Sequence, residues 1–91
     1  MAHYIASYDL HNQRHYEPVW AELESLGATR LLESLWVLSS NLPVVDIRDR
    51  LKAKGDADDS FAVIELKPQS LWATDRAQVA GVQWLRQSIS A

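Results

Sequence analysis

Apolar residues recur at two different spacings along this chain, and each spacing predicts a different kind of element. Residues 4–10 form an apolar and aromatic run that ends near an acid, which predicts a strand with apolar side chains on both faces. Such a strand fits the centre of a sheet. From Tyr16 to Leu26 the apolar residues recur at helical spacing, with Pro18 in the first turn and Gly27 at the stop, which predicts the first helix.

The next apolar run, residues 29–38, is too long for one ordinary strand. The polar pair Glu33–Ser34 interrupts it, so we expect two strands joined by a bulge or a tight bend. A second helix is then expected between a cap at Ser40 or Asn41 and a stop at Gly55, because apolar residues return at helical spacing there.

The last third of the chain predicts one more main strand and a terminal helix. Phe61–Leu66 is nearly continuous in apolar character, which favours a central strand, and Pro68 closes it. Residues 70–73 predict a short extra edge strand, and Thr74 or Asp75 can start the last helix. The whole order predicts one α+β domain over residues 1–91. It is a ferredoxin-like split βαβ sandwich with an extra edge strand and a C-terminal helix.

Composition limits the classes of function. Apolar residues make up 47% and charged residues 23% of the 91, which is typical of a soluble globular domain. There is no cysteine, no secretion signal and no apolar run near the roughly 20 residues of a membrane span, so we expect a cytoplasmic protein without disulfides or membrane contact. A net charge of −3 argues against coating nucleic acid by charge alone. Four tryptophans offer more apolar area than a small monomer covers, which predicts a homodimer.

The main candidate for chemistry is Asp9, because an acid at a strand end can face solvent, a loop, a metal or a partner subunit. The run Tyr-Ile-Ala-Ser-Tyr-Asp-Leu at 4–10, the Ser-Leu-Trp element at 34–36 and the acidic turn before Phe61 together resemble the small CRISPR-associated "Cas two" proteins. They are more closely similar to the SinR-like members found outside CRISPR loci. The resemblance covers residues 3–73 and implies a ferredoxin-like homodimer that acts as a metal-dependent endonuclease or as a nucleic-acid scaffolding subunit.

The resemblance assigns a catalytic and metal-binding role to Asp9, which matches an aspartate proposed in that family to bind a divalent cation beside its dimer mate. A two-fold axis near Asp9 would supply two carboxylates to Mg²⁺ or Mn²⁺, with water and phosphate oxygens completing the shell. Alternatively, Asp9 caps or hydrogen-bonds the loop that leads to Arg14. Where the family shows a second acid this chain has Val37, so another carboxylate would have to come from Glu33 or Glu65.

Further candidates concern partners. Arg14 and Arg48 are candidate contacts to RNA or DNA, although Arg14 can instead pair with an acid and Arg48 can belong to a solvated face supported by an Asp46–Arg50 pair. For Trp36 a place in the core is the alternative to the dimer interface. The residues expected at a dimer interface are Tyr8, Ser34, Trp36 and Trp72.

Two other groups of polar residues resemble metal sites only superficially. His11 and His15 lack the glutamate of a zinc-protease helix, and His11 is otherwise a candidate acid or base beside Asp9. The acids at 56, 58 and 59 lack the glycine and glutamate of a calcium loop, so we expect them to form a turn. Two functions remain open: a homodimer that contacts and cleaves or scaffolds nucleic acid, and a catalytically inert dimeric module with a protein partner.

Overall fold

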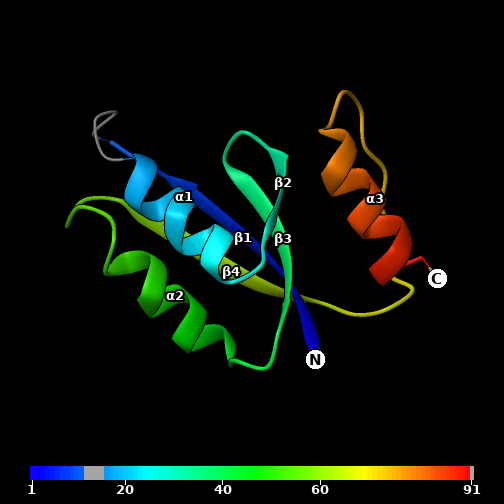
Figure 1. Ribbon diagram of the computed structural model, residues 1–91, viewed down its shortest axis with the longest axis horizontal. Coiled ribbons are helices and arrows are strands. Elements are labelled where there is room, and N and C mark those ends of the chain that lie inside the picture. The colour runs from blue at the N-terminus through cyan, green and yellow to red at the C-terminus, as the bar shows by residue number, and fades with distance from the viewer. Residues whose placement is uncertain (12–15, 91) are drawn as a thin grey trace.

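The computed structural model describes residues 1–11 and 16–90 and contains one four-stranded sheet with three helices (Figure 1). The strand order is β2-β3-β1-β4, and each neighbouring pair of strands is antiparallel. This is the split βαβ order of a ferredoxin-like fold, as the sequence predicted. The elements are β1 (Ala2–Asp9), α1 (Tyr16–Ser25), β2 (Thr29–Leu32), β3 (Leu35–Ser40), α2 (Val44–Lys52), β4 (Ser60–Leu66) and α3 (Val79–Ser88).

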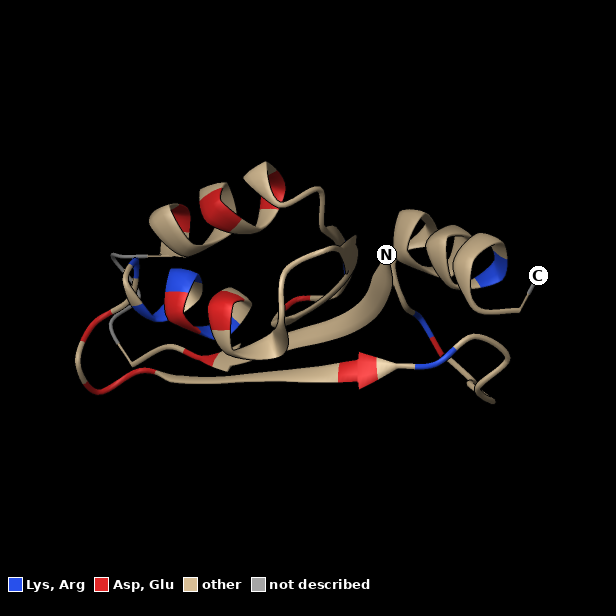
Figure 2. Cartoon of the chain, turned by 90° about the horizontal axis from the view of Figure 1, so that it is seen from below, with Lys and Arg blue, Asp and Glu red and all other residues tan. Residues whose placement is uncertain are grey.

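The main core lies between one face of the sheet and the helices α1 and α2 (Figures 1 and 2). Successive side chains of a strand point to opposite faces, so β1 places Tyr4, Ala6 and Tyr8 under these helices. Among the described residues Arg50 pairs with Glu22 of α1 at 3.8 Å, whereas no ion pair joins it to Asp46 as predicted. Buried partners from the helices and from β3 are Val19, Leu23, Trp36, Leu38, Ile47 and Leu51.

The helix α3 lies apart from α1 and α2, beside β2 (Figure 1), and builds a second core on the other face of the sheet. Its Leu85 and Ile89 are buried against Leu31 and Val37. The close approach depends on Gly81, because a Cβ there would lie 2.7 Å from the Leu31 Cα atom. A glycine therefore seats this helix directly on the backbone of β2.

The strand β4 is an edge strand, which corrects the predicted central position. Its second face remains open: Ala62 is exposed and 59% of the Ile64 surface is accessible. The apolar run alone did not distinguish a central from an edge position in the sheet. An edge strand can also be apolar on both faces when one of them is not covered by the rest of the chain.

The predicted extra strand at 70–73 does not form. The chain turns at Gln69, whose φ is 68°, and Trp72 folds back so that its indole Nε1–H donates to Ser90 Oγ at 2.7 Å. Because tertiary contacts with α3 take these residues away from the sheet edge, the local preference for a strand is overridden. The last helix accordingly begins at Val79, later than predicted.

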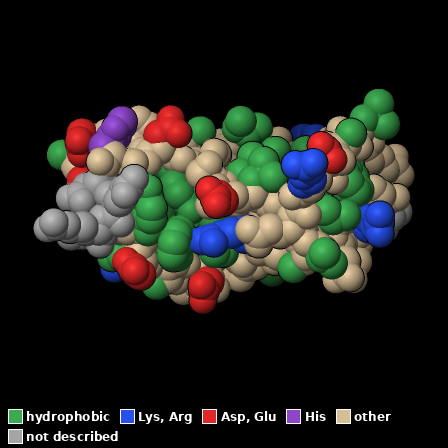
Figure 3. Space-filling view, turned by 90° about the horizontal axis from the view of Figure 1, so that it is seen from above, with side chains coloured by type: hydrophobic (Ala, Val, Ile, Leu, Met, Phe, Trp, Pro, Cys, Tyr) green, Lys and Arg blue, Asp and Glu red, His purple; other side chains and the backbone are tan. Residues whose placement is uncertain are grey.

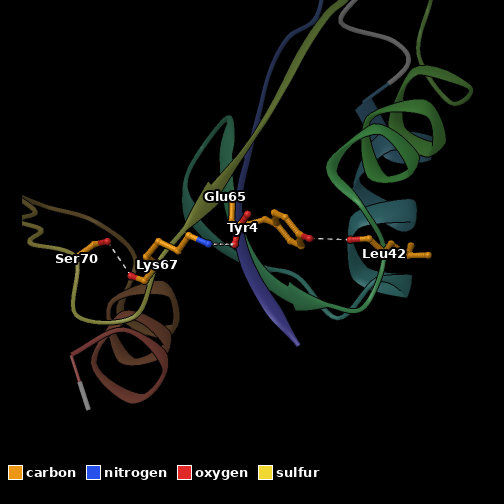
Figure 4. A network of polar contacts seen from close by, with 5 residues as sticks. All are labelled: Tyr4, Leu42, Glu65, Lys67 and Ser70. Atoms are coloured by element: carbon orange, nitrogen blue, oxygen red, sulfur yellow. Dashed lines mark hydrogen bonds and ion pairs between the residues drawn. The ribbon is translucent and has the colours of Figure 1, made fainter.

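Polar contacts fix the segments on either side of the sheet (Figure 4). The Tyr4 hydroxyl donates to the Leu42 carbonyl at 2.8 Å and holds the chain just before α2, where Pro43 precedes the first helical residue and no side chain caps the helix. At the exit of β4 the Lys67 ammonium donates to Glu65 at 2.8 Å. This hydrogen bond, together with the charge of Glu65, raises the pKa of Lys67 above its ordinary value.

No helix in the described ranges has the length and apolar character needed to cross a membrane.

Candidate functional site

The Tyr8 hydroxyl joins three elements at the end of β1. It accepts hydrogen bonds from the indole Nε1–H groups of Trp20 at 2.7 Å and Trp36 at 3.3 Å, and it donates to the Glu33 carbonyl at 3.0 Å. These contacts bring α1, β3 and the β2–β3 turn to one point. With two acceptor positions and one donor position occupied, the hydroxyl is fully engaged in structure.

Arg30 lies over both indole rings. Its guanidinium carbon is 4.5 Å from the ring centroid of Trp20 and 4.7 Å from that of Trp36, which is cation–π distance. Among the described residues no ion pair involves Arg30, and its Nε atom is buried without a hydrogen-bond partner. A charged group in this condition is uncommon, because burying a polar group unpaired costs free energy.

Tyr8, Trp20 and Arg30 are among the residues that line a cavity of about 410 Å³ beside the end of β1, here called the β1-end cavity. Figure 3 views the molecule from the side of the β2–β3 turn and shows a basic side chain among exposed hydrophobic ones, with acidic groups around them. The walls combine one cation, two carboxylates and aromatic rings, which is the mixture expected where a polar ligand binds. The lining residues are Tyr8, Asp9, Leu10, Tyr16, Trp20, Arg30, Glu33 and Ser34.

Asp9 is the last residue of β1 and is exposed. It borders both the β1-end cavity and a smaller recess of about 140 Å³ that it shares with Ser7, Ser60 and Ala62. No hydrogen bond or ion pair joins its carboxylate to another described residue. The backbone N–H of His11, in the loop after β1, donates instead to Asp59 Oδ1 at 2.9 Å. The predicted alternative, a loop cap by Asp9, is therefore not seen in the described part of that loop.

The fold brings some of the predicted site residues together and separates others. Asp9, Tyr8 and Ser34 line the same cavity, and Glu33 joins them as the second carboxylate. Glu65 does not, because it lies near the other end of β4 and is paired with Lys67. Arg14 and His15 fall outside the described residues.

Two residues expected at a dimer interface lie in the core. Tyr8 is 6% exposed and Trp36 is 5% exposed, so within one chain both side chains are buried. For Trp36 the alternative place in the core is the one observed. Trp72 is half-buried against the second core, whereas Ser34 is exposed at the β2–β3 turn.

Arg48 lies on the exposed side of α2 and is engaged by its neighbour. Its guanidinium donates to Asp49 Oδ1 from Nε at 3.0 Å and from Nη2 at 2.8 Å. Both side chains are more than half exposed, so this pair adds little stability. It lies outside the β1-end cavity.

The acids before β4 form a turn, as predicted (Figure 2, red). Asp56, Asp58 and Asp59 have carboxylate oxygens within 4.8 Å of one another. The Asp59 carboxylate accepts from the backbone N–H of Asp56 at 2.7 Å in addition to that of His11. Its oxygens thus tie this turn to the loop after β1, which is a structural role of the kind that aspartate often has in turns.

The sequence interpretation missed Arg30, Tyr16 and Trp20 as site residues. The signal that could have found this site is Arg30 itself, a basic residue inside the apolar run at 29–32. A charge that faces a layer of helices is stable only in an environment where neighbouring groups offset the cost of its burial. The aromatic rings that provide this environment come from α1 and β3, so no local motif marked the cluster.

Comparison with known proteins bears on the fold alone. No protein-family model matches the chain. A solved structure, that of the hypothetical protein TT1823 from Thermus thermophilus, superposes with a TM-score of 0.68 over 86% of this chain and 95% of that chain, at 16% sequence identity. At this identity the similarity supports the α+β fold and carries no information on activity.

Proposed function

We propose that the chain acts as a homodimer that contacts RNA or DNA at the end of β1, where the Asp9 carboxylates of two copies hold Mg²⁺ or Mn²⁺. The observation that carries this proposal is the state of Asp9: its carboxylate is exposed and has no hydrogen bond or ion pair with the described residues. An exposed carboxylate at the rim of a cavity, without a partner among the described residues, is available to a metal.

The open face of the sheet supports the dimer. By the alternation of side chains, Ile5, Ser7 and Asp9 point to the face opposite α1 and α2, and the β1–β4 register places Ile64 beside Ile5 on that face. Ile64 is 59% exposed, so an apolar surface remains on the face of the sheet to which Asp9 also points, four residues along β1 from it. A second copy packed on this face by two-fold symmetry would cover Ile64 and bring its own Asp9 toward this one.

The carboxylates of one chain supply only some of the oxygen ligands that a divalent cation such as Mg²⁺ needs. Asp9 supplies carboxylate oxygens and Glu33 lines the same cavity, which is fewer oxygens than the octahedral shell of Mg²⁺ requires. The Asp9 of a second copy, water and phosphate oxygens would complete it. When bound, such an ion would polarise a phosphate and activate water.

The experiment compares Asp9→Asn with Asp58→Asn, a matched change of an exposed carboxylate in the acidic turn. We expect Mg²⁺ or Mn²⁺ to raise the melting temperature of the parent protein and of Asp58→Asn but not that of Asp9→Asn. Any cleavage of single-stranded RNA or DNA should disappear with the same variant. A metal shift and cleavage that both survive in Asp9→Asn would refute the proposed role of this residue.

A second candidate function is a catalytically inert dimeric module that binds a protein partner. It is favoured by Val37, which is fully buried at the position where an acid would assist Asp9, and by the net charge of −3. The two candidates differ in their response to salt. Binding of nucleic acid that weakens steeply as salt rises would exclude the inert module, whereas no binding at low salt would favour it.

A further inference from the structure

We propose that the β1-end cavity binds one unpaired nucleotide of a single strand, with its phosphate on Arg30 and its base against the aromatic side chains of α1. The inference rests on the proposed function in taking nucleic acid as the ligand. It does not require the metal or the dimer, so each can fail without the other.

The state of Arg30 points to an anion. Its positive charge lies at a cavity wall, it has no carboxylate partner among the described residues, and its Nε atom is closed off from solvent without a hydrogen bond. An anion in the cavity would therefore meet the terminal nitrogens of the guanidinium. Arginine suits phosphate there because its planar fork donates two parallel hydrogen bonds, and the indole rings of Trp20 and Trp36 already hold the fork in place.

The aromatic wall points to a base. Tyr16 and Trp20 lie one helical turn apart on α1, with ring centroids 5.5 Å apart and ring planes inclined by 33°. Both are half-buried and both line the cavity, so part of each remains accessible to a ligand. Aromatic side chains beside a cationic one are the usual means of binding single-stranded nucleic acid, because every base has a face that can stack.

The size and the charges of the cavity limit the ligand further. A volume of about 410 Å³ suits one small ligand and excludes a duplex. Asp9 and Glu33 also line the walls and would repel a bare phosphate that occupied their side of the cavity. A nucleotide avoids this conflict, because its phosphate can lie at Arg30 while an exocyclic amine of the base donates to the Glu33 carboxylate. Adenine and cytosine carry such an amine on their pairing edge and uracil does not, so AMP and CMP should bind more tightly than UMP.

The test measures binding of AMP, CMP, UMP and inorganic phosphate to the full chain by calorimetry, at low salt and with EDTA to remove metals. Arg30→Gln removes the charge in the cavity, and Arg86→Gln removes a charge from the exposed side of α3 as the matched control. We expect AMP to bind the parent protein and Arg86→Gln equally, and Arg30→Gln roughly tenfold or more weakly, as for loss of a charged hydrogen bond. Glu33→Gln, at an exposed turn, should reduce the preference for AMP over UMP while the protein stays folded.

Three results would overturn the inference: no nucleotide binding by the parent protein, equal affinities of Arg30→Gln and Arg86→Gln, or inorganic phosphate binding as tightly as AMP. If Arg30→Gln does not fold, Glu33→Gln still decides, because an unchanged preference between AMP and UMP would refute the placement of the base. Binding of AMP in EDTA does not depend on the proposed metal site, which the melting-temperature shift tests independently, so the two proposals can fail separately.

Discussion

The contact between α3 and β2 depends on Gly81, and Gly81→Ala tests it directly. The added Cβ would lie 2.7 Å from the Arg30 carbonyl oxygen, 2.7 Å from the Leu31 Cα atom and 2.9 Å from the Leu31 Cβ atom. Backbone atoms cannot rotate away, so α3 or β2 must shift. Overpacking of this kind costs about 1–3 kcal/mol, and backbone contacts favour the upper half of that range.

The higher helix propensity of alanine offsets part of this loss of stability. Alanine stabilises a helix interior by about 1 kcal/mol relative to glycine and less in the first turn, where Gly81 lies, so the expected net loss for Gly81→Ala is about 1–3 kcal/mol. In a domain of this size each kcal/mol lowers the melting temperature by roughly 4–8 °C. The loss should appear as a lower urea midpoint with an unchanged slope.

The neighbouring Ala80 supplies the control, because it is exposed on the same helix. Ala80→Gly, also in the first turn, should cost at most about 1 kcal/mol from helix propensity, without a clash. If Gly81→Ala is as stable as the parent protein or more stable, α3 is not seated on the backbone of β2 as described. Since Arg30 lies at this contact, the same variant should also weaken binding of AMP if the β1-end cavity takes a nucleotide.

Three further changes test other parts of the structure. Tyr8→Phe leaves the indole N–H groups of Trp20 and Trp36 without their acceptor and should cost about 1–3 kcal/mol in urea unfolding, whereas an unchanged midpoint would contradict the hydrogen-bonded cluster. Leu51→Ala empties a fully buried position under the sheet and should cost about 2–5 kcal/mol, and a loss well below this range would argue against close packing of α2. The raised pKa of Lys67 means that its pair with Glu65 stabilises the fold while the ammonium is protonated. The stability difference between the parent and Lys67→Met should therefore change as the pH rises through that raised pKa, in the direction of a lost advantage for the parent, and a difference that stays constant across this range would contradict the assignment.

The order of elements was predictable because each depends on spacing within a short window. The polar pair Glu33–Ser34 interrupts one apolar run, and the structure turns there between β2 and β3. The helical spacing from Tyr16 likewise marks α1 to within a residue of its end. Where local pattern and tertiary packing agree, the sequence is sufficient.

The errors arise where distant segments decide the outcome. The apolar character of Phe61–Leu66 suits either a central strand or an edge strand with an uncovered face, and only the sheet order separates them. Residues 70–73 lose their strand because Trp72 bonds to Ser90, far along the chain. Neither the order of the strands nor the hydrogen bond between Trp72 and Ser90 can be predicted from the spacing of apolar residues within a short window.

Only some residues of the candidate site could be predicted from the sequence. Asp9 stands out at a strand end, and Ser34 lies where the bend was expected. The cation–π contacts of Arg30 join β2 to rings on α1 and β3, so they exist only once the sheet and helix are assembled. The β1-end cavity is in this sense a tertiary feature that spacing rules do not describe.

The most direct test of the proposed function is the number of Mn²⁺ ions bound per chain, measured by electron paramagnetic resonance alongside the mass of the protein in solution. If two Asp9 carboxylates share an ion across a two-fold axis, a dimer binds one Mn²⁺ for every two chains, and Asp9→Asn abolishes this binding. A monomer, or a dimer whose Mn²⁺ binding is unchanged in Asp9→Asn, would contradict the proposal.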